Sequence, residues 1–193
     1  MSNQEIRRSL GRTIWKALSL DGDFYENARN TPLNRATARS IVILAALSYM
    51  LGSALILLVN RASLPLFLLA LLLSGLSVTA GYYFWTFTIW QIGKWLRRSS
   101  LTYGELLIPI GFAYAPQVLN FLTLIPLLGR PIELVLSAWS LLAVIVAVRQ
   151  GLDITTLRAA LICLVGWPLI QTAIGSVQVF EQWLVRTQGV SLL

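Results

Sequence analysis

The chain has 193 residues, of which 56% are apolar and only 12% are charged, whereas an average soluble protein is about 45–50% apolar and about 25% charged. This composition excludes an ordinary soluble domain and indicates a membrane protein. The net charge of +7 does not indicate a nucleic-acid partner, because the basic residues fall at the edges of apolar segments. Histidine is absent, which removes the commonest general base and the commonest metal ligand. We therefore expect neither an enzyme nor a bound cofactor or metal.

The N-terminal segment, residues 1–35, is predicted to be cytosolic and to contain an amphipathic helix. Residues 5–20 (EIRRSLGRTIWKALSL) place apolar side chains at helical spacing, with basic side chains between them. The basic residues are Arg7, Arg8, Arg12 and Lys16. Each basic side chain held near anionic lipid is worth about 1 kcal/mol, and Trp15 adds an interfacial ring, so we expect this helix to lie on the cytosolic membrane surface. The alternative is a solvated helix that packs on its own bundle.

A short acidic stretch follows, in residues 21–29 (DGDFYENAR). Its two aspartates resemble the start of a calcium loop, but the third acidic position and the terminal glutamate of such a loop are missing. A turn in which Asp23 caps a short helix is therefore favoured.

Five apolar segments follow, at residues 40–59, 64–90, 106–128, 132–148 and 157–180. A helix needs about 20 apolar residues to cross the hydrocarbon of a bilayer, and four segments reach that length while the fourth in order is at the lower limit. The predicted fold is all-α, an integral membrane bundle of five transmembrane helices over residues 36–180, with an N-terminal amphipathic interfacial helix. Small residues, among them Ser48 and Ser140, recur where helices are expected to approach closely.

The basic residues divide unevenly between the two sides that five crossings imply. Twelve precede the first segment or lie in the second and fourth loops, whereas Arg61, Arg130 and Arg186 lie on the other side. The positive-inside rule places the N-terminus in the cytosol and the C-terminal tail, residues 181–193, outside. Glu133 follows Arg130 by three residues, and we expect a local ion pair there.

The third apolar segment carries the most unusual residues. Pro109, Pro116 and Pro126 each remove a backbone donor, so this helix is predicted to be kinked. Gln117, Asn120 and Thr123 follow one face, and we expect this polar stripe to point into the bundle. The last segment has similar polarity at Gln171, so the two broken helices are expected to face each other.

Two interpretations of this stripe remain open. In the first, the amides bridge helices and satisfy the kinks, with each hydrogen bond worth on average about 0.6 kcal/mol. In the second, the kinked helices line a polar cavity for a solute or a partner helix. The first is favoured, because no charged residue lies near the middle of any segment.

Residues 111–116 (GFAYAP) resemble the motif in the third span of the Ypt-interacting-protein (Yip) domain family of polytopic membrane proteins. The residues that carry the resemblance are Gly111, Phe112 and Pro116, and a basic, threonine-rich loop before the last segment is also similar. The resemblance covers roughly residues 36–180 and implies five spans with a cytosolic N-terminus. The family's characteristic tyrosine is Phe112 here.

The resemblance implies a non-enzymatic membrane protein. Eukaryotic members bind Rab-type GTPases, associate with one another and act in vesicle traffic, whereas this compact chain looks more like the prokaryotic members. We expect a membrane scaffold or partner-binding subunit in the plasma (inner) membrane or an internal membrane of a prokaryote. Its expected partners are anionic lipids at the cytosolic face and other membrane proteins or further copies of itself. The alternative is a small-solute transporter or channel with a polar cavity between the third and fifth spans.

Overall fold

A computed structural model describes residues 3–28, 31–59, 61, 63–97, 102–125, 127–166, 172, 179 and 183. Among these residues the chain is helical and has no β-strand, which confirms the all-α class. In chain order, the elements are α1 (Asn3–Leu18), α2 (Gly22–Glu26), α3 (Pro32–Val59), α4 (Leu64–Arg97), α5 (Tyr103–Phe112), the 3-10 helix η1 (Ala115–Leu124) and α6 (Gly129–Leu152). A shorter apolar helix, Thr156–Gly166, follows α6.

Three helices, α3, α4 and α6, are long and apolar enough to cross a membrane. The pair α5 and η1 is bent by 42° and makes a fourth span if it is counted as one. The fifth predicted segment begins as the helix Thr156–Gly166, and most of its remainder lies outside the described residues. The structure therefore supports three to four membrane-crossing helices, and the count of five stays a prediction.

The helices extend beyond the apolar segments that the sequence defines. The first begins at Pro32 rather than near residue 40, and Thr31 caps it, because its Oγ1 accepts the backbone N–H of Asn34 at 3.2 Å. The second continues to Arg97, and α6 spans 24 residues rather than residues 132–148 alone. Hydropathy falls at the first polar residues, but arginine, lysine and glutamine are good helix formers, so the backbone continues through them.

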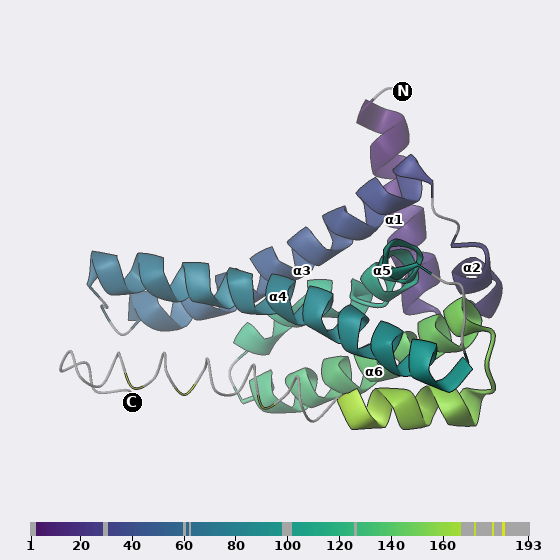
Figure 1. The fold of residues 1–193 in the computed structure, drawn as a ribbon. Helices are drawn as coiled ribbons and strands as arrows, with labels where there is room; N and C mark the ends of the chain where they lie inside the picture. The colour runs from purple at the N-terminus through teal and green to yellow at the C-terminus, as the bar shows by residue number, and fades with distance from the viewer. Residues whose placement is uncertain are drawn as a thin grey trace.

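The antiparallel helices α3 and α4 form one arm of the molecule, and α5, η1 and α6 pack beside it around a shared core (Figure 1). The elements α1, α2, the start of α5 and the last turn of α6 meet at one end, which we call the N-terminal end (Figure 1). There Gln150 of α6 donates a hydrogen bond from Nε2 to the carbonyl oxygen of Gly22 at 3.2 Å. At the opposite end, Arg130 and Glu133 form the predicted ion pair, with 2.9 Å between Nη1 and Oε2.

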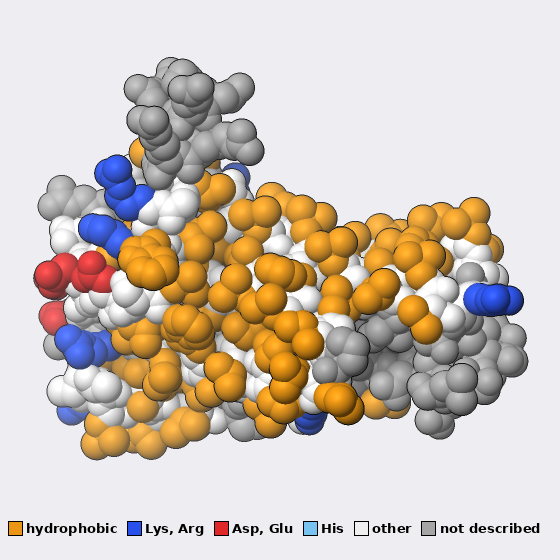
Figure 2. All heavy atoms as spheres, turned by 180° about the vertical axis from the view of Figure 1, so that it is seen from behind, with side chains coloured by type: hydrophobic (Ala, Val, Ile, Leu, Met, Phe, Trp, Pro, Cys, Tyr) orange, Lys and Arg blue, Asp and Glu red, His pale blue; other side chains and the backbone are white. Residues whose placement is uncertain are grey.

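On the face that Figure 2 shows, apolar side chains cover most of the surface between these two ends. Acidic and basic side chains gather mainly at the N-terminal end (Figure 2). On α3 the outward apolar side chains recur every three or four residues, at Ile43, Leu47, Leu51, Leu55 and Leu58. A continuous apolar surface of this extent is typical of helices that face lipid.

The short helix α2 connects α1 to the bundle. Its cap is Asp21 rather than the predicted Asp23, because Oδ1 of Asp21 accepts the backbone N–H groups of Asp23 and Phe24 at 3.1 and 3.3 Å. Tyr25 is buried and donates a hydrogen bond from Oη to the carbonyl oxygen of Ala17 at 3.2 Å. Burial raises the pKa of Tyr25 far above its usual value, so this side chain remains a neutral donor.

Helix α1 is present over Asn3–Leu18 and packs on the bundle along part of its length. Ala17 is fully buried, Leu10, Ile14 and Leu18 pack against the core, and Trp139 of α6 donates from Nε1 to the carbonyl oxygen of Leu18 at 3.0 Å. The apolar face that the sequence assigns to lipid is therefore covered, in its second half, by the chain's own helices. Trp15 lies on another face and is 73% exposed.

Candidate functional site

The GFAYAP segment forms the bend in the third span. Helix α5 ends at Phe112, η1 begins at Ala115, and Pro116 lies in the first turn of η1, where a missing N–H costs least. The 42° bend confirms the predicted kink and places it at residues 113–114. Of the other two prolines, Pro109 lies inside α5. Pro126 lies outside the described residues.

At the bend α5 approaches α3 very closely, and Gly111 permits this approach. A Cβ atom at this position would lie 2.9 Å from Cβ of Ala38 and 3.3 Å from Oη of Tyr82. Carbon atoms pack at about 3.5–4.0 Å, so a side chain at this position would force the helices apart. The glycine of the motif thus has a steric role at the crossing of two helices.

Aromatic side chains surround the bend. The buried ring of Phe112 lies 5.0 Å from the ring of Phe24, between centroids, which joins the bend to α2. Tyr114 meets Tyr82 edge to face, with 5.5 Å between centroids, and Oη of Tyr82 donates to the carbonyl oxygen of Leu107 at 2.7 Å. A tyrosine of α4 therefore binds the backbone of α5 just before the bend.

The polar stripe lies on the face of η1 that meets α3 and α6. Gln117 is 9% exposed, and its Nε2 donates to Oγ of Ser140 on α6 at 2.8 Å. Its Oε1 accepts a hydrogen bond from Oη of Tyr49 on α3 at 3.0 Å. The amide of Gln117 thus bridges three helices, and the prediction that it points into the bundle is confirmed.

The other members of the stripe are divided between the core and the local backbone. The side chain of Asn120 is 6% exposed, which also places it inside the bundle. Thr123 is half-buried and donates from Oγ1 to the carbonyl oxygen of Asn120 at 2.7 Å, so it satisfies its own helix. The stripe aligns because residues i and i+3 eclipse in a 3-10 helix. Gln171 lies outside the described residues, so its predicted position opposite the stripe is untested.

The sequence did not reveal three side chains that bind the bend. Oγ of Ser48 on α3 accepts the backbone N–H of Phe121 at 2.7 Å, and Tyr49, the next residue, binds Gln117. The sequence marks Ser48 and Ser140 only as small residues. It marks Tyr49 only as an aromatic side chain with a polar hydroxyl within an apolar helix. Their pairing with η1 depends on the bend, which rotates the polar face toward both neighbouring helices.

The basic residues of the N-terminal helix are not part of this cluster. Arg7 and Arg8 lie within α1, and the side chains of Arg12 and Lys16 are exposed at the N-terminal end. Within the part of the chain that the structure describes, no group of three histidine, cysteine, aspartate or glutamate side chains could hold a metal ion.

The fold and the bend define an all-helical protein with several helices able to cross a membrane, joined around a broken third span. No protein-family model, curated protein or solved structure matches the chain. The polar atoms of the bend can orient and lock helices, since the hydrogen bonds observed there join one helix to another or to its own backbone.

Proposed function

We propose that the protein is a non-enzymatic integral membrane protein of the Yip type, which acts as a scaffold or partner-binding subunit. In this proposal it crosses the membrane five times, with a cytosolic N-terminus and an outer C-terminus, in the inner or an internal membrane of a prokaryote. The observation that carries the proposal is the pair of hydrogen bonds made by the side-chain amide of Gln117. Both ends of its amide are bonded to the chain's own helices, by Tyr49 and Ser140, so the bend fixes a rigid arrangement of helices.

A fixed arrangement suits a protein that presents a constant outer surface to its neighbours. The close contact of Gly111 with Ala38 and the capture of the Leu107 carbonyl by Tyr82 support the same interpretation, because each ties α5 to another helix. Opening such an interface would break several hydrogen bonds in apolar surroundings, where a polar group without a partner costs several kcal/mol, to an order of magnitude.

The alternative of a small-solute transporter or channel has less support. A transport pathway needs polar groups that remain available to the solute, whereas the amide of Gln117 is already occupied. The last segment is the other expected wall of the cavity, and Gln171 lies outside the described residues.

The lipid partners are proposed at the N-terminal end. Helix α1 runs across this end of the bundle rather than along it, as a helix in the membrane plane would (Figure 1). Its exposed side chains there include Arg12, Trp15 and Lys16, a combination that suits the headgroup region of an anionic bilayer. In this arrangement one face of α1 packs on the bundle and another meets lipid.

The proposal is tested by purifying the tagged full-length chain from native membranes in detergent-free nanodiscs and identifying retained proteins by mass spectrometry. An unrelated polytopic protein with the same tag serves as the control. We expect a discrete membrane protein, or further copies of the chain, to be enriched over this control. Enrichment of lipid alone, together with solute flux in liposomes above that of empty liposomes, would instead support the transporter.

A further inference from the structure

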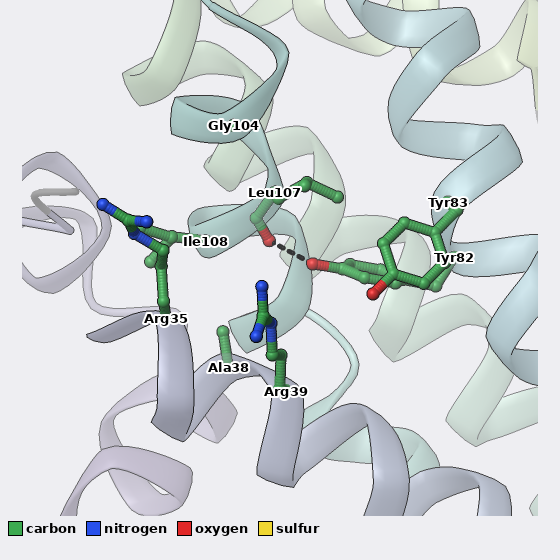
Figure 3. A pocket seen from close by; sticks show the side chains of 8 residues that line it. All are labelled: Arg35, Ala38, Arg39, Tyr82, Tyr83, Gly104, Leu107 and Ile108. Carbon is green, nitrogen blue, oxygen red and sulfur yellow. Dashed lines mark hydrogen bonds between the residues drawn. The ribbon is translucent and has the colours of Figure 1, made fainter. Parts of the chain in front are cut away.

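A cavity of about 170 Å³ opens between α3, α4 and α5 at the N-terminal end, outside the polar cluster of the bend. Arg35 and Arg39 of α3 line one part of it, Tyr82 and Tyr83 of α4 another, and Gly104 and Leu107 of α5 complete it. The guanidinium of Arg39 points into this cavity, toward the hydrogen bond between Tyr82 and Leu107, and the hydroxyl of Tyr83 lies on the same side (Figure 3).

The side chains that line the cavity are either positively charged hydrogen-bond donors or neutral groups. Within the described part of the chain, no ion pair engages Arg35 or Arg39. The carboxylate of Glu105, which follows Gly104, is bonded elsewhere, since Oε2 accepts the backbone N–H of Thr102 at 2.9 Å and its hydroxyl at 2.8 Å. The guanidinium of Arg39 and the hydroxyl of Tyr83 thus present donors within the cavity, while Arg35, whose guanidinium points away from that of Arg39 in Figure 3, adds a second positive charge at its edge.

The cavity also lies at a defined depth. Along α3, Arg39 stands about 30 Å from Val59, at 1.5 Å rise per residue, and along α4, Tyr82 stands about 27 Å from Leu64. Both distances equal, within a turn of helix, the thickness of about 30 Å of a bilayer's hydrocarbon. If the link between α3 and α4 lies at one boundary of the hydrocarbon, the cavity lies at the other, where lipid phosphates are found.

We propose that this cavity binds a phosphate group, carried either by a phospholipid headgroup or by a free anion. Guanidinium groups match phosphate oxygens in geometry and donate charge-assisted hydrogen bonds, which are stronger than neutral ones. The hydroxyl of Tyr83 adds a further donor at the rim. This site is separate from the exposed basic face of α1, and it does not depend on the scaffold proposal.

The test measures retention of phosphatidylglycerol on the delipidated full-length protein by native mass spectrometry, with a diacylglycerol of the same acyl chains as the phosphate-free probe. We expect Arg35→Gln/Arg39→Gln to weaken phosphatidylglycerol binding on the order of tenfold or more. The matched control is Arg149→Gln/Arg158→Gln, which removes the same charge from the same end, where both side chains are exposed, but outside the cavity. Equal losses in the two double variants would mean that net charge alone attracts the lipid, and would overturn the site.

A second variant tests the cavity without changing any charge. Gly104 lines the cavity, and a Cβ there would meet no atom within 4 Å, so Gly104→Leu favours the helix and is designed to place apolar volume at the cavity. We expect this variant to fold, as checked by circular dichroism, and to lose phosphatidylglycerol as the arginine variant does; binding equal to wild type would contradict the proposal. Competition then identifies the source. If excess inorganic phosphate leaves the phosphatidylglycerol bound, the site recognises a lipid headgroup. If the phosphate displaces the lipid, the site binds the free anion.

Discussion

Gln117 of η1 donates a hydrogen bond to Oγ of Ser140 on α6 over 2.8 Å, across 23 positions of the sequence and inside the bundle. Tyr49 of α3 donates to the other end of the same amide. One side chain therefore fixes the distances among three helices. It also explains why an amide stands in an apolar segment, because the bent span needs a polar contact with each neighbour.

Replacing Gln117 should destabilise the bundle and leave its partners without a bond. Interhelical hydrogen bonds in membranes average about 0.6 kcal/mol and reach about 1.7 kcal/mol, so we expect Gln117→Leu to lower the free energy of unfolding by about 1–2 kcal/mol. A double-mutant cycle combines Gln117→Leu with Ser140→Ala, and steric trapping in bicelles measures the unfolding free energy of each variant. We expect a coupling energy on the order of 0.6 kcal/mol.

The control cycle pairs Ser140→Ala with Thr79→Val, which removes a hydrogen bond from Oγ1 of Thr79 to Gly75 within α4. This pair should show no coupling, because the two sites share no partner. Additive effects in the Gln117 and Ser140 cycle as well would show that their contact contributes nothing to stability.

Gly111 should tolerate no side chain, whereas Gly81 should tolerate one. A Cβ at Gly111 would meet Ala38 at 2.9 Å, while a Cβ at Gly81 would meet nothing within 4 Å. We expect Gly111→Ala to destabilise by about 1–3 kcal/mol through overpacking, and Gly81→Ala to stabilise by about 0.5–1 kcal/mol through helix propensity. Thermal unfolding in detergent measures both, and Ala38→Gly should partly rescue the first variant. Equal effects of the two alanines would remove the close crossing as an explanation of the motif.

Much of this arrangement was accessible from the sequence. Continuous hydropathy located α3, α4, α6 and the bent third span, and the prolines located a kink, because both signals are local. The inward position of Gln117 followed from the cost of exposing an amide to lipid. Its partners did not follow, since Tyr49 lies 68 positions away and becomes a neighbour only after α3 and η1 have packed.

The arginines of the cavity show a different limit. Arg35 and Arg39 were read only as part of the charge asymmetry that orients the chain, and that reading needs no tertiary contact. Their association with Tyr82 and Tyr83 depends on the crossing of α3, α4 and α5. The interfacial role of α1 was likewise inferred from its pattern, which cannot tell whether an apolar face meets lipid or the chain's own helices.

Tyr25 should make the docking of α1 sensitive to alkaline pH. Burial raises the pKa of Tyr25 in the folded state above its usual value of about 10. The resulting stabilisation is complete below that usual value and is lost as the pH rises above it, because the unfolded phenol ionises first. Amide hydrogen exchange of α1 should therefore speed up above pH of about 10 more in wild type than in Tyr25→Phe. At neutral pH we expect Tyr25→Phe to lower the free energy of unfolding by about 0.5–1.5 kcal/mol, because the hydrogen bond to the carbonyl oxygen of Ala17 is lost. The same pH dependence in both proteins would assign the effect to another group.

Trp15 should enter the headgroup region if the exposed face of α1 meets lipid. Its side chain is 73% exposed at the N-terminal end, next along the helix to Lys16. In proteoliposomes that contain brominated phosphatidylglycerol, we expect wild type to lose more tryptophan fluorescence to quenching than Trp15→Phe, and the difference between them reports Trp15 alone. Removing the charges with Arg12→Gln/Lys16→Gln should reduce this difference, since each basic residue near an anionic surface is worth about 1 kcal/mol. Brominated phosphatidylcholine, which carries no net charge, should give a smaller difference for the same reason. If wild type and Trp15→Phe lose the same amount of fluorescence in both lipids, Trp15 stays in water, and α1 serves only to pack on the bundle.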